Sequence, residues 1–185
     1  MSKTPLPDYR AKISPRVLVF TATFNEKQNI SLLLQGISAA VPDADMMVID
    51  DNSPDGTGKL LNDLAISNHK LKVINRPSKL GLGAAHYMAM LYSIQNQYDI
   101  LVTMDADLSH DPVDIPRLIS KLDGVNFVIG SRYAPGGSCD YLGYRKHLSA
   151  VGNWIARLLM GIPLHEFTTS FRVFDVHALS TIKFN

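Results

Sequence analysis

Cysteine is almost absent from this sequence, since Cys139 is the only cysteine among 185 residues. An internal disulfide is therefore excluded, and there is no second cysteine to build a zinc site around it. This scarcity favours a reducing compartment, so we expect the chain to act in the cytoplasm.

A strong charge of either sign is also missing. The 18 Lys and Arg residues nearly balance the 17 Asp and Glu residues, which leaves a formal net charge of +1. The net charge therefore does not indicate any class of binding partner, and nucleic acid is not expected as one. With 46% hydrophobic and 19% charged residues, the composition is that of an ordinary globular domain and not of a disordered chain.

Long hydrophobic runs are lacking as well. No stretch approaches the roughly 18 apolar residues of a membrane-spanning helix, and residues 1–15 lack the apolar centre of a secretory signal. We interpret residues 1–15 as an N-terminal extension and residues 16–185 as one domain. The apolar segment 149–164 is interrupted by Asn153 and Arg157, so it could pack in a core or lie on a membrane. If it meets a membrane, we expect peripheral contact on the cytoplasmic face.

What the sequence does contain is an alternation of strand-like and helix-like patterns. Short apolar runs, mostly β-branched and each interpreted as a strand buried on both faces, span residues 16–22, 45–50, 71–75, 100–104 and 126–130. Helical spacing covers residues 30–40, 57–67, 83–96 and 113–122, and a later helix is predicted at about 145–160. This order predicts an α/β fold with an open, mostly parallel sheet and helices on both faces.

Polar residues follow every predicted strand at its carboxyl end. The clusters are residues 23–26, 50–58, 76–85, 105–111 and, after the fifth strand, Arg132. Ligands of open α/β sheets bind beyond this edge, so five polar clusters there predict a site for a large polar ligand.

Asp105 and Asp107 form an Asp-x-Asp motif directly after the fourth predicted strand. Two carboxylates so spaced can share one hard cation, and oxygen ligands select Mg²⁺ or Mn²⁺. No Lys or Arg occurs between Asp99 and Asp114, so a bound cation, or a basic side chain from elsewhere in the fold, must balance the charge. The plainer alternative is that these aspartates only cap turns.

Two further loops could bind a nucleotide. Asp50 and Asp51 precede a turn, where carboxylates can accept hydrogen bonds from ribose hydroxyls or base N–H groups. Segment 79–85 opens a helix and offers Lys79 and backbone N–H groups to an anion, although its glycines could serve only a tight loop.

Basic residues collect late in the chain. Residues 131–160 hold Arg132, Arg145, Lys146 and Arg157 against a single acid, Asp140. A solvated helix face accounts for Lys146 and Arg157, whereas Arg132 follows a strand and suits bidentate phosphate binding.

Six motifs together resemble those of the dolichol-phosphate mannosyltransferases (polyprenol-phosphate mannose synthases) among the family 2 glycosyltransferases. They are TFNEKQNI, VIDDNSPDGTG, KLGLGAA, MDADLSHDP, VIGSRYAPGG and TTSFR, and the resemblance runs from about Val17 to Arg172. It implies the A-type glycosyltransferase fold, a nucleotide-sugar donor such as GDP-mannose, a polyprenol (dolichol) monophosphate acceptor and a Mg²⁺ or Mn²⁺ cofactor.

The resemblance also implies a role for each matching position. Nucleotide-sugar contacts fall on Thr23, Asn25, Glu26, Asp51, Asn52, Lys79, Gly81 and Asp105. The metal ligands would be Asp105, Asp107 and Ser109, the last at a position where relatives often carry Gln. The acceptor phosphate would be cradled by Arg132, Arg145 and Ser149, and the predicted catalytic residues are Asp105, Asp107 and Arg132.

Three features depart from the family pattern. Ala22 replaces a proline, while Glu166 and Ser170 replace an Asp and a Gly in the last motif. Relatives usually continue past the position of Asn185, so we expect either a short form or a chain trimmed at its C-terminus.

The expected reaction is displacement, with inversion, at the anomeric carbon of the donor by a lipid-phosphate oxygen. A phosphate is already anionic and needs no general base, so His86, His110 and His147 are predicted to have packing or surface roles. Three alternatives stay open: transfer of glucose from UDP-glucose to the same acceptor, a non-catalytic nucleotide-sugar-binding module, and a phosphatase of the haloacid dehalogenase type. The last normally carries its Asp-x-Asp on the first strand, whereas here the motif follows the fourth.

Overall fold

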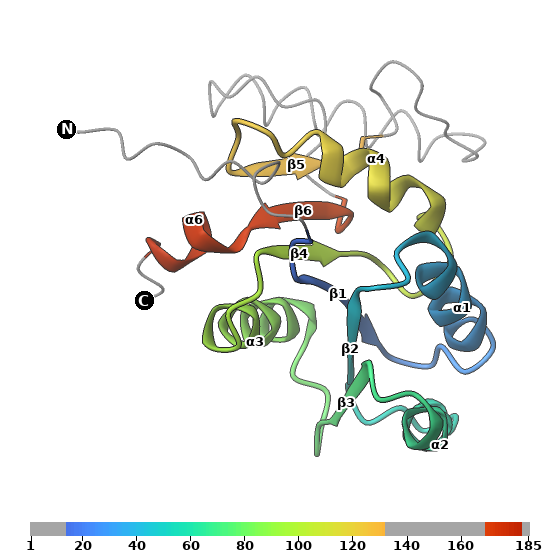
Figure 1. The fold of residues 1–185 in the computed structure, drawn as a ribbon. Helices are drawn as coiled ribbons and strands as arrows, with labels where there is room; N and C mark the ends of the chain where they lie inside the picture. The colour runs from blue at the N-terminus through green and yellow to red at the C-terminus, as the bar shows by residue number, and fades with distance from the viewer. Residues whose placement is uncertain (1–13, 132–168, 183–185) are drawn as a thin grey trace, which may run out of the picture.

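The computed structural model describes residues 14–131 and 169–182. Within these ranges six strands form one sheet in the order β3-β2-β1-β4-β6-β5 (Figure 1). The strands are β1 Val17–Thr23, β2 Asp45–Asp50, β3 Leu71–Asn75, β4 Ile100–Thr103, β5 Phe127–Ile129 and β6 Arg172–Asp175. The helices are α1 Ile30–Ala40, α2 Thr57–Ser67, α3 Leu82–Gln95, the 3₁₀ turn η2 Pro112–Asp114, α4 Ile115–Ser120 and α6 Val176–Ser180.

The sheet is mostly parallel. β1 pairs in parallel with β2 and β4, and β2 pairs in parallel with β3. β6 is antiparallel to both of its neighbours, β4 and β5. The predicted α/β class and open, mostly parallel sheet are therefore confirmed, while the antiparallel strand was not predicted.

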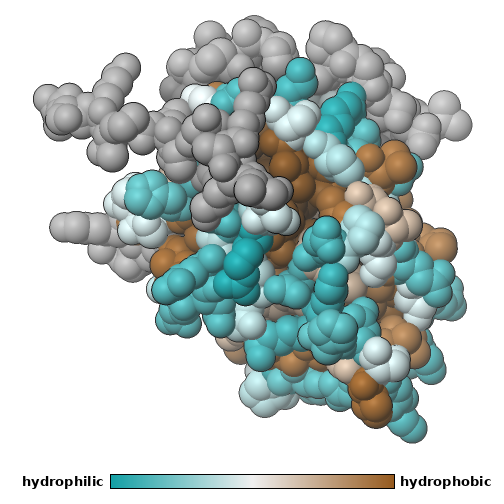
Figure 2. Space-filling model, viewed as in Figure 1, coloured by the Kyte–Doolittle hydropathy of each residue, from teal (hydrophilic) through white to brown (hydrophobic). Residues whose placement is uncertain are grey.

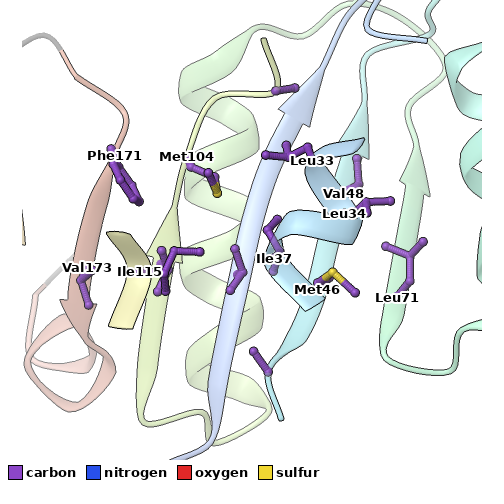
Figure 3. Packing of buried hydrophobic residues seen from close by; sticks show 14 of the residues in the cluster. Leu33, Leu34, Ile37, Met46, Val48, Leu71, Met104, Ile115, Phe171 and Val173 are labelled. Carbon is purple, nitrogen blue, oxygen red and sulfur yellow. The ribbon is translucent and has the colours of Figure 1, made fainter. Parts of the chain in front are cut away.

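Helices cover both faces of the sheet, as predicted (Figure 1). α1, α2 and α4 pack on one face, where Leu33, Leu61 and Ile115 join one apolar cluster. Figure 3 shows Leu33 and Ile115 within this cluster. α3 and α6 pack on the other face, through residues such as Ala85 and Leu179. Because apolar residues recur at helical spacing in α1, the helix presents one apolar stripe to the sheet.

The predicted strands and helices agree closely with the observed ones. α1 and α2 match the predicted ranges at both ends. Segment 113–122 divides into η2 and α4, because Pro116 lacks the N–H that a continuous helix from Pro112 would need. The expectation that every strand is buried on both faces is wrong for β3 and β5. Both lie at edges of the sheet, and Phe127 of β5 is 44% exposed.

Several expectations lie outside the described residues: the predicted helix at about 145–160 and most of the N-terminal extension, residues 1–13. Within the described ranges, no helix has the length and apolarity that crossing a bilayer requires. Figure 2 shows hydrophilic residues over much of the described surface in this view, with apolar residues in separate patches.

Candidate functional site

The topology identifies the edge of the sheet at which a ligand would bind. From β1 the chain moves outward to β2 and β3, then returns to form β4 on the opposite side of β1. Open α/β sheets bind ligands beyond the carboxyl ends of the strands at such a reversal. The loops after β1 and β4 begin on either side of this point, and the Asp-x-Asp motif belongs to the second of them.

The loop after β1 is fastened to the loop after β2. Three of its backbone N–H groups donate to side chains of the second loop: Asn25 to Ser53 Oγ, Glu26 to Thr57 Oγ1 and Lys27 to Asp55 Oδ2, at 2.9, 3.1 and 3.1 Å. The side chain of Glu26 accepts a hydrogen bond from Asn29 Nδ2 at 2.8 Å. Asn25 and Glu26, both predicted to bind the nucleotide sugar, therefore lie in a loop of defined shape.

Asp50 is buried and holds the two loops from beneath. Its Oδ1 accepts from the hydroxyls of Thr23 and Ser53, and its Oδ2 accepts from the backbone N–H of Ser53 at 2.9 Å. Thr23, predicted to contact the nucleoside, is 2% exposed, and its hydroxyl is used in this contact. The side chain of Thr23 thus supports the loop, and its contact with a ligand stays a prediction.

Asp51 points to a different set of partners. Its Oδ1 accepts from Arg76 Nη1 at 2.8 Å and its Oδ2 accepts from the backbone N–H of Gly81 at 2.9 Å. Arg76 Nη1 also donates to the Gly81 carbonyl at 3.2 Å. The predicted nucleotide-binding residues Asp51 and Gly81 are therefore brought together, and an ion pair buried on both sides joins the loops after β2 and β3.

Arg76 is the residue of this cluster to which the sequence alone assigned no role. Its Nε and Nη2 atoms are buried and have no hydrogen-bond partner among the described residues. Leaving a buried donor without an acceptor is costly, roughly 1–3 kcal/mol. The burial of the Arg76 side chain beside Asp51 makes these two donors a candidate contact for a ligand. The signal in the sequence was its position, directly after β3.

Lys79 and Asn52 complete this side of the edge. Lys79 Nζ lies 3.7 Å from the centroid of the Phe24 ring, a cation–π contact that joins the third loop to the first. Asn52 Nδ2 donates to the Pro77 carbonyl at 3.2 Å. Both residues were predicted to contact the nucleotide sugar, and both occupy the same group of three connected loops.

Three non-glycine residues in the loops at this edge of the sheet adopt a left-handed backbone conformation. Asn25, Asn52 and Leu108, with φ of 65°, 59° and 62°, lie in the loops after β1, β2 and β4. Such residues are costly and are concentrated at functional sites. Their position supports this edge as the candidate site.

Asp105 and Asp107 lie in the loop after β4. The side chain of Asp105 is 36% exposed, and Asp107 is exposed. Partial burial raises the pKa of Asp107, but hydrogen bonds from the hydroxyl and the backbone N–H of Ser109 lower it, and the net pKa shift is downward. The hydrogen bonds from Ser109 thus favour the ionised form of Asp107. That Asp107 and Ser109 are metal ligands stays a prediction.

The donor set of this loop fits a hard divalent cation. Two carboxylates with accessible oxygens follow one strand, and the described residues contain no group of three or more His, Cys, Asp or Glu side chains that could hold a metal alone. Mg²⁺-type sites commonly take one or two protein carboxylates and complete their coordination with substrate phosphates and water. Asp105 and Asp107 suit a site of that kind.

His86 of α3 lies next to the Asp-x-Asp loop. Its ring meets the edge of Phe20 at 5.2 Å between centroids. Burial lowers the pKa of His86, the charge of Arg172 lowers it further, and the charge of Asp105 partly opposes both effects. The imidazole is therefore held neutral between an acidic loop and the first residue of β6. The predicted packing role of His86 agrees with this position.

The residues predicted to bind the acceptor phosphate, Arg132, Arg145 and Ser149, lie outside the described residues. Among the described residues, the structure brings together the predicted nucleotide-sugar residues of the loops after β1, β2 and β3. It places the predicted metal ligands one strand away, after β4.

Comparison with known proteins gives one family. Residues 18–183 match the model of glycosyl transferase family 2. The chain is 38% identical over 170 residues to a polyprenol monophosphomannose synthase of Mycolicibacterium smegmatis, covering 90% of this chain and 64% of that protein. It is 37% identical over 168 residues to an undecaprenyl-phosphate mannosyltransferase of Micrococcus luteus, covering 90% of this chain and 69% of that protein. The chain thus spans about two thirds of the length of these relatives.

Solved structures agree on the fold. A mannosyltransferase from Pyrobaculum calidifontis, in complex with GDP-Man and Mn²⁺, is 25% identical with a TM-score of 0.55, covering 63% of this chain and 35% of that one. Glucosyl-3-phosphoglycerate synthase from Mycobacterium tuberculosis, in complex with Mn²⁺, UDP and phosphoglyceric acid, is 20% identical with a TM-score of 0.67, covering 94% and 60%. The second likeness bears on the fold alone.

Proposed function

The chain belongs to glycosyl transferase family 2, and from that premise we propose that it transfers mannose from GDP-mannose to a polyprenol monophosphate. The observation that carries the proposal is the similarity, over 90% of the chain, to two proteins named for mannosyl transfer to a polyprenol or undecaprenyl phosphate. The Asp-x-Asp loop at the reversal point of the sheet is the structural feature that supports it.

The donor is proposed to be GDP-mannose. The Pyrobaculum mannosyltransferase, the structural neighbour at 25% identity, was solved with GDP-Man and Mn²⁺. On this chain the nucleoside would lie over the connected loops of Asn25, Asp51 and Lys79, and the two unpartnered donors of Arg76 could meet acceptor atoms of the base or ribose.

The metal is proposed to be Mg²⁺ or Mn²⁺, held by Asp105 and Asp107 with the donor's phosphate oxygens. When bound, it would neutralise charge on the leaving diphosphate. The chain's own contribution is to hold both carboxylates on one loop and to favour the ionised form of Asp107 through hydrogen bonds from Ser109, which lower its pKa. Ser109 is retained as a proposed third ligand.

The reaction proposed is a single displacement with inversion. An oxygen of the lipid phosphate attacks the anomeric carbon, the bond from that carbon to the diphosphate breaks, and GDP leaves with the bonding electrons. Arg132, Arg145 and Ser149 are proposed to bind the acceptor phosphate, and their task is to position an oxygen that is already anionic. Because the attacking oxygen is already anionic, His86 and His110 are not used as bases.

Two alternatives remain as outcomes of the test, and the family match removes the phosphatase of the haloacid dehalogenase type. The first alternative is glucose transfer from UDP-glucose, for which the structural likeness supplies only a common fold. The second is binding of a nucleotide sugar without turnover.

The experiment incubates the purified protein with radiolabelled GDP-mannose or UDP-glucose, a polyprenyl phosphate in detergent, and Mg²⁺ or Mn²⁺. We expect label from GDP-mannose in the organic phase, and its loss when EDTA is added. Transfer of label from UDP-glucose and not from GDP-mannose would show that UDP-glucose is the donor and would contradict the proposed one. Calorimetric binding of GDP-mannose without any lipid product would favour a binding module and contradict the proposed transfer.

A further inference from the structure

Contacts around His110 join the Asp-x-Asp loop to the chain just before β6. His110 is buried, its Nδ1 lies 3.1 Å from the backbone N of Asp105, and its Nε2 lies 3.2 Å from Thr169 Oγ1. We propose that His110 is a positioning residue that fixes the main chain of Asp105, and with it the ion-binding loop, against the start of β6. The inference rests on the proposed function in taking Asp105 and Asp107 as ligands of a divalent ion.

The hydrogen bonds determine which ring nitrogen carries the proton. A backbone N–H can only donate, so Nδ1 of His110 must be the unprotonated acceptor of the Asp105 N–H. The proton of the neutral ring then lies on Nε2, which donates to Thr169 Oγ1. Thr169 Oγ1 also accepts the backbone N–H of Phe171 at 3.1 Å. One rigid ring therefore supplies an acceptor to the Asp-x-Asp loop and a donor to the segment before β6.

Packing holds the ring of His110 in this orientation. It stacks on Phe171, with ring centroids 5.0 Å apart and an interplanar angle of 23°. Phe171 is 5% exposed and lies against Gly130, where an added Cβ would come within 2.9 Å of the Phe171 ring. The absence of a side chain at Gly130 thus leaves room for the ring on which His110 rests.

The bond from Asp105 to His110 closes a short loop that contains both carboxylates. This loop also contains Leu108, whose φ of 62° is left-handed and costs roughly 1–2 kcal/mol relative to ordinary backbone. A closed loop keeps that conformation, so the two carboxylates are already ordered when an ion arrives. Partners of metal ligands commonly act in this way.

The same geometry leaves the carboxylate of Asp105 available. Its Oδ2 lies 3.8 Å from His110 Nδ1, which is longer than a hydrogen bond. Because Nδ1 accepts from the backbone, it has no proton to donate to this carboxylate. His110 therefore holds the main chain of Asp105 without binding the oxygens that an ion needs.

The test measures the Kd of Mn²⁺ by calorimetry in the presence of GDP, without turnover, together with the unfolding midpoint. His110→Phe keeps a ring on Phe171 but has neither acceptor nor donor, so we expect its Kd to rise roughly 10- to 100-fold, the usual effect of removing such a partner. His110→Asn retains an acceptor for the Asp105 N–H and should recover part of the loss. Thr169→Val leaves the bond from Asp105 to His110 in place but removes the hydroxyl that contacts His110 Nε2 and accepts the Phe171 N–H, so it should lose less affinity than His110→Phe. Asp107→Ala deletes a ligand and provides the positive control for lost ion binding.

Thr103→Val is the matched structural control. Thr103 Oγ1 donates to the Ser170 carbonyl, so it ties the end of β4 to the segment before β6 through a hydrogen bond that does not involve Asp105. This variant should lower the unfolding midpoint while its Kd for Mn²⁺ stays within twofold of the wild-type value. A folded His110→Phe protein with wild-type affinity overturns the inference. If His110→Phe does not fold, wild-type affinity in a folded Thr169→Val protein overturns it instead.

The outcome is separate from that of the proposed function. A wild-type protein that transfers mannose, together with a His110→Phe variant of unchanged Mn²⁺ affinity, overturns the positioning role alone. A wild-type protein that binds Mn²⁺ with GDP and transfers nothing overturns the transfer reaction, while the expected loss in His110→Phe still supports the positioning role.

Discussion

At the scale of single residues, two adjacent aspartates do different work. Asp50 is enclosed by Thr23 and Ser53 and supports the loops from below, whereas Asp51 pairs with Arg76 and the backbone of Gly81. The difference arises because successive side chains of an extended segment point in opposite directions. Substituting Asp50 would therefore disturb loop shape, and substituting Asp51 would release the buried charge of Arg76.

His86 gives a prediction about pH. Its pKa is lowered from 6.5 in the folded protein, chiefly because burial disfavours the imidazolium, so the unfolded chain takes up the proton more readily. The stability that neutral His86 contributes is present above pH 6.5 and is lost as pH falls through that value toward the lowered pKa. His86→Phe retains a ring beside Phe20 but cannot titrate.

The measurement is the urea midpoint at pH 7.5 and pH 5.5. We expect His86→Phe to lose less stability than the wild-type protein between these values. His69→Phe, at an exposed position, is the control and should keep the wild-type pH dependence. Equal losses of stability in His86→Phe and in the wild-type protein would contradict a lowered pKa of His86 in the folded state.

Sequence reasoning reached the acidic residues of the site more easily than their partners. Asp51, Asp105 and Asp107 stand out because each closely follows an apolar run, at the end of a strand where ligands of open α/β sheets bind. Arg76 stands in a Pro- and Gly-containing loop and resembles a solvated base. Its burial becomes evident only when β3 pairs with β2 and sets it beside Asp51.

At the scale of elements, two helices begin with a glycine at their second position, in opposite surroundings. In α2, a Cβ at Gly58 would lie 2.6 Å from Asn75 Oδ1 and 3.1 Å from Asp50 Oδ2. In α3, a Cβ at Gly83 would meet nothing within 4 Å among the described residues. The start of α2 thus packs directly on Asp50, which supports the loops of the candidate site, whereas the start of α3 is open.

These two glycines form a matched pair of substitutions. Gly58→Ala should destabilise the protein by about 1–3 kcal/mol, because Asp50 is held by several hydrogen bonds and cannot easily move. Gly83→Ala should stabilise it by about 0.4–1 kcal/mol, since alanine reduces the freedom of the unfolded chain. Chemical unfolding of both variants measures the two effects. A stabilising Gly58→Ala would show that Asp50 and Asn75 yield without cost.

The central elements could be predicted from sequence, and the exceptions have physical causes. The ranges of α1 and α2 follow from apolar periodicity and local turn residues, such as Asp55, whose carboxylate accepts the Thr57 N–H. β6 has only four residues, begins with Arg172 and ends with Asp175, so its local pattern is weak. It is a strand because β4 and β5 pair with it.

At the scale of the whole molecule, the proposed reaction joins a water-soluble donor to a lipid. Within the described ranges no helix meets the requirement for spanning a bilayer. The proposed acceptor is a lipid, so we expect the protein to reach it at a membrane surface. The sequence between residues 131 and 160 carries Arg132, Arg145, Lys146 and Arg157 against Asp140. Basic groups of this kind are attracted to anionic lipid headgroups by roughly 1 kcal/mol each.

We therefore expect the protein to co-sediment with vesicles that contain anionic lipid. Neutral vesicles are the control and should retain much less protein, because the attraction is electrostatic. Binding should weaken in about 0.5 M salt, where charges are screened over a few ångströms. Absence of binding to anionic vesicles at low salt would contradict a peripheral membrane location.

The position of β6 in the sheet also determines when the sheet can form during synthesis of the chain. β6 is the last strand in sequence among the described residues, yet it lies between β4 and β5. Until residues 172–175 have emerged from the ribosome, β4 has a bare edge and β5 has no strand beside it. Bare edges of this kind invite aggregation, and pairings between distant parts of a chain form slowly. The strand that precedes Asp105 therefore gains this neighbour only after residues 172–175 have been made, and we expect its edge to need protection until then.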